Sequence, residues 1–190
     1  MAPSRNLWIS ISHSDRLAYE EIFIYYFNRY CNYGKKFTDD STLIEDAAQE
    51  TMLAIWNKRE TIPTIDQVAA YFYTSFRYIL FNKLKQVKKT VGEEHFTDEP
   101  EFSIDHFMIK KELDNELRIR LKTALASLTD RQREAIFLKF YEGLSYEEVS
   151  AIMNISTKAT YKIMARALGM LKENFGLSGS VLFLFLSRMG

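Results

Sequence analysis

Residues 128–172 read LTDRQREAIFLKFYEGLSYEEVSAIMNISTKATYKIMARALGMLK, and this stretch predicts three short helices separated by tight turns. Thr129 with Gln132, and Ser145 with Glu148, fit the capping box, in which two residues three positions apart satisfy each other's backbone N–H groups. We therefore expect the first helix to begin after Thr129 and the second after Ser145.

The turn residues of this stretch agree with its capping signals. Gly143 lies where a residue in the left-handed conformation commonly ends a helix. Asn154 tolerates the same conformation between the second and third helices. Ser156 is then a suitable N-cap for the third helix, which begins at Thr157. Two short helices joined by a tight turn predict a helix-turn-helix.

Charge is segregated between the helices of this predicted motif. From Glu142 to Asn154 the residues charged at pH 7 are all acids, and from Ser156 to Lys172 they are all bases. The bases Lys158, Lys162 and Arg166 recur at every fourth residue, so they form one stripe along the third helix. Next to it we expect an apolar stripe that packs on the preceding helices; it consists of Ala159, Ile163 and Ala167.

A basic stripe beside short polar groups suits a helix that enters the major groove of DNA. Basic side chains bind phosphates there, while the other polar groups reach the base edges. The alternative is a solvated helix face without a partner. The candidate duplex-binding residues are Ser156, Thr157, Lys158, Thr160, Tyr161, Lys162 and Arg166.

The stretch from Leu128 to Leu168 resembles the C-terminal promoter-binding domain of bacterial sigma factors. The residues that carry the resemblance are LTDRQRE (128–134), YEGLSYEEV (141–149) and Ile155-Ser156 with the helix that follows. Quorum-sensing and response-regulator activators contain a similar element, so the N-terminal half must decide between these classes. Ile163 and Met164 stand where sigma factors commonly have polar residues, which leaves the promoter sequence open.

Composition limits the classes of protein that this chain can represent. Its 190 residues are 47% hydrophobic, which predicts packed domains, and its formal net charge is zero. Any DNA binding must therefore come from local basic patches.

The single cysteine, Cys31, excludes an internal disulfide, and residues 1–14 lack the pattern of a cleavable signal peptide. The apolar run at 181–186 is too short to span a membrane. We expect a cytoplasmic protein.

The N-terminal half predicts three further helices and no strand. They are expected to begin at Ser14, at a Thr42–Glu45 capping box and at a Thr64–Gln67 cap. Residues 90–105 then contain six acids without a lysine or arginine, which is typical of an extended linker. We therefore expect an all-α chain of two small helical domains joined by a flexible acidic linker. The predicted parts are an N-terminal domain (1–90), the linker (91–106), a helix-turn-helix domain (107–177) and an apolar tail (178–190).

The segment from Leu43 to Lys89 resembles the central conserved domain of sigma factors. Its matching parts are LIEDAAQE (43–50), Ile55-Trp56, AYFY (70–73) and Arg77, although Tyr71 stands where the family often has tryptophan. Both halves occur in the family's order with only a short linker between them, which is similar to the extracytoplasmic-function (ECF) group. The resemblance implies a subunit that gives core RNA polymerase promoter recognition, and an acidic linker that follows the polymerase's RNA channel.

The resemblance also implies roles for the N-terminal domain. A helix bearing Asp46, Gln49 and Glu50 would dock on a coiled coil of the largest polymerase subunit, and these groups suit arginines on a partner helix. The loop 61–66 would hold a flipped base.

On the helix expected after the Thr64–Gln67 cap, aromatic rings alternate with hydrogen-bond donors, which suits the binding of single-stranded DNA. By the resemblance, this DNA would be the melted minus-ten element. If Tyr71 is buried, we expect Tyr73 to be available to DNA. The candidates are Tyr71, Tyr73, Arg77, Tyr78, Asn82, Lys83 and Lys85.

We find little in the sequence that indicates an enzyme, a cofactor or a metal site. The histidines are scattered, Cys31 has no visible base, and no phosphate-binding glycine loop is present. His95 and His106 among the linker acids lack a known metal-ligand spacing. The expected partners are core RNA polymerase, promoter DNA and, by the resemblance, an anti-sigma protein that is often membrane-bound. The alternative function is a stand-alone helix-turn-helix activator with an N-terminal helical sensor domain.

Overall fold

The computed structural model describes residues 5–61, 67–91, 101–103 and 115–175, and these residues contain helices and no strand. The chain divides into two compact units, Met1–Pro100 and Glu101–Gly190. The helices are α1 (Arg5–Ser12), α2 (Arg16–Gly34), α3 (Ser41–Lys58), α4 (Val68–Val91), α5 (Asn115–Ala126), α6 (Asp130–Ile136), η1 (Phe137–Tyr141), α7 (Tyr146–Ile152) and α8 (Thr157–Phe175). The predicted all-α class is confirmed.

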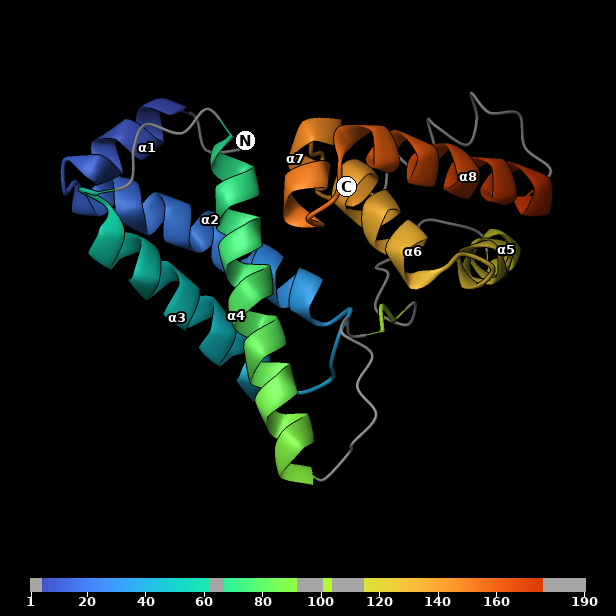
Figure 1. The fold of residues 1–190 in the computed structure, drawn as a ribbon, viewed down its shortest axis with the longest axis horizontal. Helices are drawn as coiled ribbons and strands as arrows, with labels where there is room; N and C mark the ends of the chain where they lie inside the picture. Colours follow the sequence, from blue (N-terminus) through green and yellow to red (C-terminus); the bar gives the residue numbers. More distant parts are fainter. Residues whose placement is uncertain (1–4, 62–66, 92–100, 104–114, 176–190) are drawn as a thin grey trace. The chain divides into compact units, whose positions relative to one another are not determined.

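In the N-terminal unit, α2 and α3 pack side by side and α4 lies across both (Figure 1). Their core is rich in aromatic rings. Tyr26 stacks on Phe72 and Tyr30 stacks on Phe76, each with ring centroids 4.4 Å apart. The Tyr30 hydroxyl donates a hydrogen bond of 2.9 Å to the backbone carbonyl of Phe72, so this buried phenol has a partner. Burial raises the pKa of Tyr30 well above its ordinary value.

Two predicted helix starts in this unit are wrong. Asp15, not Ser14, caps α2, and its carboxylate accepts from the backbone N–H groups of Leu17 and Ala18. Asp40 caps α3 by accepting from the Leu43 N–H, so Thr42 lies inside the first turn and the Thr42–Glu45 capping box does not form. In both cases an aspartate next to the expected cap provides the acceptor that the free N–H groups require. The predicted Thr64–Gln67 cap depends on residue 64, which lies outside the described residues.

Two further features of this unit were not predicted. Helix α1 buries Trp8, whose ring meets Phe72 edge-on at 5.8 Å and Tyr71 at 6.2 Å. Gly34, the last residue of α2, lies so close to α3 that an added Cβ would approach Ile44 Cγ2 to 2.6 Å. Only a glycine allows this approach without displacement of its neighbours.

In the C-terminal unit, α5, α6 and α7 all pack against α8 (Figure 1). The helix predicted to begin after Thr129 is present, but it changes from α6 to the π-helical segment η1, where the Glu142 N–H donates to the Phe137 carbonyl. Such π-helical turns are frequent at functional sites.

The capping and turn predictions for this unit are confirmed. The Thr129–Gln132 box has N–H to oxygen distances of 2.9 and 3.3 Å, and the Ser145–Glu148 box has 2.8 and 3.1 Å. Gly143 and Asn154 have φ values of 73° and 52°. Ser156 Oγ accepts from the Ala159 N–H at 3.2 Å, so Ser156 caps α8. These residues form the predicted helix-turn-helix.

Phe102 belongs to the core of the C-terminal unit, although the sequence analysis places it in the linker. Its side chain is 1% exposed and its ring lies 5.9 Å from that of Phe137. Arg133 Nε donates to the Phe102 carbonyl at 2.9 Å, and Arg133 Nη1 donates to the Leu128 carbonyl at 2.7 Å. Arg133 also forms an ion pair with Asp130. An apolar ring within an acidic segment thus anchors that segment to α6. The rest of the predicted linker, 92–100 and 104–106, lies outside the described residues.

Candidate nucleic-acid interface

The predicted basic stripe lies on the outer face of α8. Lys158, Lys162 and Arg166 are all exposed, as are Ser156 and Tyr161. Between Glu142 and Lys172 all the acids precede α8; Glu148 is held by its capping box and Glu147 faces solvent. The face therefore presents three cations to an anionic partner.

The buried side of α8 is offset from its predicted position. The expected stripe was Ala159, Ile163 and Ala167, of which only Ala167 is buried. The residues that pack against α5, α6 and α7 share the spacing of one helix face: Thr160, Met164, Ala167 and Leu171. The larger Met164 and Leu171 side chains bury more apolar surface than Ala159 and Ile163 could, which sets the rotation of the helix.

This rotation corrects one predicted DNA contact. Thr160 is 0% exposed, and its hydroxyl donates to the Ser156 carbonyl at 3.3 Å, so it belongs to the core. Thr157 is half-buried, with its Oγ1 3.3 Å from Ser150 Oγ on α7. The accessible candidates on α8 are Ser156, Lys158, Tyr161, Lys162 and Arg166, with Thr157 at their edge.

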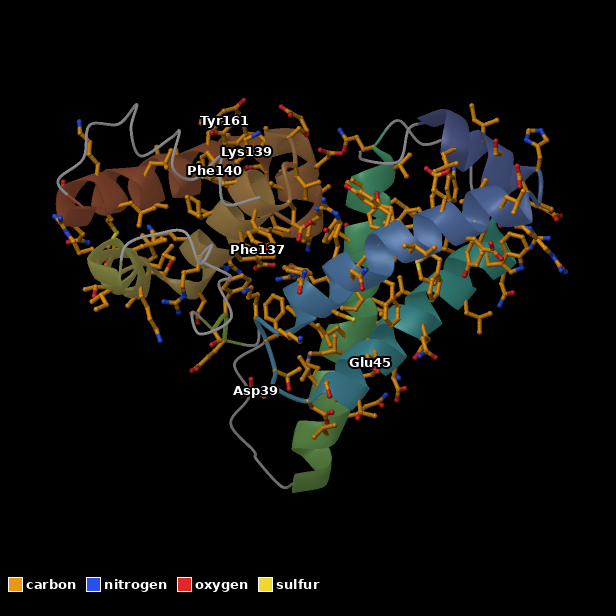
Figure 2. All side chains as sticks on the ribbon, turned by 180° about the vertical axis from the view of Figure 1, so that it is seen from behind. Asp39, Glu45, Phe137, Lys139, Phe140 and Tyr161 are labelled. Atoms are coloured by element: carbon orange, nitrogen blue, oxygen red, sulfur yellow. The ribbon has the colours of Figure 1, made fainter. Side chains whose placement is uncertain are left out.

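The structure adds two residues to this site that were not predicted, Tyr146 of α7 and Lys139 of η1. Tyr161 stacks on Tyr146 of α7 with ring centroids 4.2 Å apart and planes at 21°. Lys139 of η1 lies with Nζ 4.9 Å from the centre of the Tyr146 ring and donates to the Leu144 carbonyl at 2.8 Å. Lys139 and Tyr161 are labelled in Figure 2. Burial, and then the neighbouring Tyr161, raise the pKa of Tyr146 above its ordinary value.

On α4 the structure separates the candidates for single-stranded DNA into two sides. The spacing of Tyr71, Tyr78, Asn82 and Lys85 puts these residues on one side of the helix. Tyr78 is 69% exposed and Lys85 is exposed, while Tyr71 and Asn82 are half-buried. Burial raises the pKa of Tyr71, and a hydrogen bond with Ser75 lowers it.

Tyr73 does not belong to this surface, and its predicted availability to DNA is wrong. Its side chain is 1% exposed, and its ring meets those of Tyr26, Tyr30 and Tyr33 edge-on at 5.7–6.0 Å. Tyr73 lies about 200° around the helix from Tyr71. The two rings face apart, as their spacing predicts, but Tyr73 and not Tyr71 is the ring that enters the core.

Arg77 and Lys83 lie beside the side of α4 that carries Tyr78 and Lys85, and both have partners within the N-terminal unit. The Arg77 guanidinium is 4.2 Å from the centre of the Phe81 ring. Lys83 Nζ lies 2.9 Å from Glu50 Oε2 on α3. The candidate loop 61–66 falls almost entirely outside the described residues.

The predicted polymerase-binding edge lies on the outer face of α3. Asp46, Gln49 and Glu50 are all exposed, on the side opposite the buried Ala47 and Met52. Glu45, labelled in Figure 2, is exposed next to them. Leu53 lies on the same face and is 58% exposed, which the sequence analysis missed. Its position one turn after Gln49 and outside the apolar stripe could have identified it.

Among the described residues no cluster of histidine, cysteine and acidic groups is arranged to hold a metal ion. His95 and His106 lie outside them. None of the described helices is long and apolar enough to cross a membrane.

Comparison with known proteins agrees with a chain of two helical units that has a helix-turn-helix in the second. The family described as "Sigma-70, region 4" matches residues 118–171. The chain is 31% identical over 132 residues to the ECF RNA polymerase sigma factor SigF of Caulobacter vibrioides, covering 68% of this chain and 69% of that protein. This match is longer than the C-terminal unit, so it includes part of the N-terminal unit.

Two solved structures share the fold. The sigma factor RpoE of Bartonella quintana, in complex with the anti-sigma factor NepR, has a TM-score of 0.60 and 20% identity over 84% of this chain and 97% of that one. CnrH, in complex with the cytosolic domain of CnrY, has a TM-score of 0.58 and 18% identity over 92% and 97%. The chain therefore belongs to the ECF RNA polymerase sigma factors, which direct the polymerase to promoters and initiate transcription.

Proposed function

We propose that the two units divide promoter recognition between them, with the exposed face of α8 binding the minus-thirty-five element as duplex DNA. The observation that carries this proposal is the segregation of charge within the helix-turn-helix. Lys158, Lys162 and Arg166 are exposed along one helix, and the preceding acids lie outside it. Lysine and arginine contacts to phosphate hold a recognition helix in register, while neighbouring side chains contact base edges.

For the N-terminal unit, we infer that the exposed side of α4 captures the non-template strand of the melted minus-ten element. Tyr78 supplies an exposed ring on which a base stacks, and Tyr71 supplies a second ring seven residues earlier. Asn82 and Lys85 continue the same side with a hydrogen-bonding group and a cation. Tyr73 supports the core beneath this surface.

Docking on core RNA polymerase is assigned to α3. Asp46, Gln49 and Glu50 offer carboxylate and amide oxygens that accept charge-assisted bonds from arginines, and Leu53 adds an exposed apolar side chain. A sigma factor supplies promoter recognition, while the polymerase synthesises the RNA. We therefore propose that this chain catalyses no reaction itself and works in the cytoplasm with the polymerase. The sigma factor RpoE is bound to an anti-sigma factor in its solved structure, so we also propose a protein inhibitor of this chain.

The test is reconstitution of transcription with the full chain and core RNA polymerase. We expect the chain to co-purify with core polymerase and to produce a transcript from its promoter that core polymerase alone does not make. An exposed-face variant, Lys158→Ala with Lys162→Ala, should still co-purify but give much less transcript. Transcription without core polymerase association, or a double variant with full activity, would contradict the proposal.

A further inference from the structure

Tyr161 is held against a second tyrosine at the centre of the proposed recognition surface. Its ring stacks on that of Tyr146, with centroids 4.2 Å apart and planes inclined by 21°. Tyr161 nevertheless keeps 50% of its surface exposed. The two residues come from different helices of the motif, α8 and α7, so the stack connects the recognition helix to the helix before it.

Tyr146 is itself fixed from a third element. Lys139 of η1 lies with its ammonium 4.9 Å from the centre of the Tyr146 ring, within the range of a cation–π interaction. The same ammonium donates to the Leu144 carbonyl at 2.8 Å, in the turn that leads into α7. Lys139 thus contacts both the Tyr146 ring and the turn that leads into α7, and Tyr146 in turn supports Tyr161.

The exposed surface around Tyr161 has two chemical characters. Lys158, Lys162 and Arg166 form its basic part, suited to phosphates. Tyr161 and Ala165 lie one turn apart, are both exposed, and form its apolar part. In the major groove an apolar contact distinguishes thymine from the other bases, because only thymine presents a methyl group there.

We propose that Tyr161 recognises the methyl group of a thymine in the major groove, and that Tyr146 is the positioning residue that holds the Tyr161 ring for this contact. This inference rests on the proposed function of α8 as the recognition helix. A ring already held by stacking loses less conformational freedom when DNA binds, so Tyr146 contributes to sequence discrimination without touching DNA.

The expected effects are modest and measurable. Burial of one methyl-sized group corresponds to about a fourfold change in affinity. Loss of a stacked aromatic pair corresponds to a change of about two- to tenfold. Discrimination between thymine and uracil, which differ only by that methyl group, isolates the first effect.

The experiment uses the full chain with core RNA polymerase. A binding site is selected from random-sequence duplex DNA, and each thymine in it is then replaced in turn by deoxyuridine. At one position we expect the wild type to lose about fourfold in affinity. Tyr161→Ala and Tyr146→Ala should lose this sensitivity, whereas Tyr161→Phe and Tyr146→Phe, which keep the rings, should retain it. Lys158→Ala is the matched control and should bind more weakly with the sensitivity unchanged.

The sensitivity is a ratio within each variant, so a uniform loss of folded protein cancels from it. If Tyr161→Ala keeps the uracil sensitivity, the methyl contact is wrong. If Tyr146→Ala keeps it while Tyr161→Ala loses it, the positioning role of Tyr146 is wrong. Loss in Tyr161→Phe would assign the contact to the hydroxyl and overturn the proposal. A holoenzyme that selects no sequence would instead contradict the proposed function itself, and the inference with it.

Discussion

Lys83 and Glu50 form an ion pair between α4 and α3, with Nζ and Oε2 2.9 Å apart. The lysine belongs to the candidate DNA-binding residues and the carboxylate to the candidate polymerase-binding residues. One contact therefore joins the proposed docking edge of α3 to a lysine that lies beside the proposed DNA-binding side of α4. The side chains are 29% and 56% exposed, so the pair is screened by solvent and contributes little to stability.

The first prediction follows from this pair. Glu50→Gln removes the anion beside Lys83, and we expect the full chain without polymerase to bind single-stranded DNA more tightly, by less than about fivefold, the range of exposed ion pairs. Fluorescence anisotropy with a labelled oligonucleotide measures the change. Glu45→Gln, an exposed neighbour on the same helix, is the control for net charge. An equal gain in both variants, or a gain that persists when Lys83→Met is added, would assign the effect to net charge and not to the pair.

A second prediction concerns polymerase docking. Asp46→Arg places a cation on the exposed face of α3, where we propose that partner arginines bind, so affinity for core polymerase should fall at least about tenfold. The melting temperature should stay unchanged because Asp46 is exposed. Pull-down and circular dichroism measure the two quantities. Glu20→Arg on α2 is the control, since this residue is exposed outside the proposed edge. Normal pull-down of the Asp46 variant would remove the docking assignment.

A third prediction contrasts two tyrosines of α4. Tyr73→Ala should lower the free energy of unfolding by about 3–5 kcal/mol, because it removes a buried ring from the core. Tyr78→Ala should leave stability unchanged and lower the open-complex population roughly fivefold to a hundredfold, the effect of losing one stacked base. Thermal melting and permanganate footprinting distinguish the two outcomes.

A template with a pre-opened bubble provides the control for Tyr78. It should restore part of the activity of Tyr78→Ala, because the polymerase no longer has to drive opening. It should not restore Tyr73→Ala, whose defect is folding. A Tyr78 variant that transcribes normally from closed duplex would exclude the stacking role.

The fourth prediction addresses the basic stripe. If Lys162 binds a phosphate, Lys162→Ala should weaken binding by a similar factor for all duplex sequences and reduce the salt slope by about one unit. Titrations of the holoenzyme at several salt concentrations measure this slope. Lys122→Ala, an exposed lysine on α5, is the matched control. A relaxed preference at a single base position would instead show that Lys162 reads a base.

A fifth prediction tests the close contact at the end of α2. Gly34→Ala should destabilise the protein by about 1–3 kcal/mol, because its Cβ would overlap Ile44 and crowd Phe76. Denaturant unfolding measures the loss. Gly34→Ala should cost less in the background of Ile44→Ala, which removes both γ carbons that the new Cβ would meet. Wild-type stability in Gly34→Ala would mean that α3 can shift to make room.

The sequence by itself determined the local features of the helix-turn-helix and the all-α class. Capping boxes join residues three positions apart, and the left-handed conformations of Gly143 and Asn154 depend on their own backbones. These interactions are complete within a few residues, so a sequence pattern is sufficient to identify them. The basic stripe of α8 follows from helical spacing alone, since its residues lie on one element.

Only the tertiary structure decided which of several chemically similar side chains enters the core. Spacing shows that Tyr71 and Tyr73 face apart, but the aromatic cluster of Tyr26, Tyr30 and Tyr33 on α2 determines that Tyr73 is buried. In the same way, packing against the other helices of the unit turned Thr160 inward. The stacking of Tyr161 on Tyr146, the anchoring of Phe102 and the Glu50–Lys83 pair all join residues far apart in the chain or on different helices. Burial is a property of the whole assembled unit, because the free energy of removing a ring from water depends on the partners that surround it.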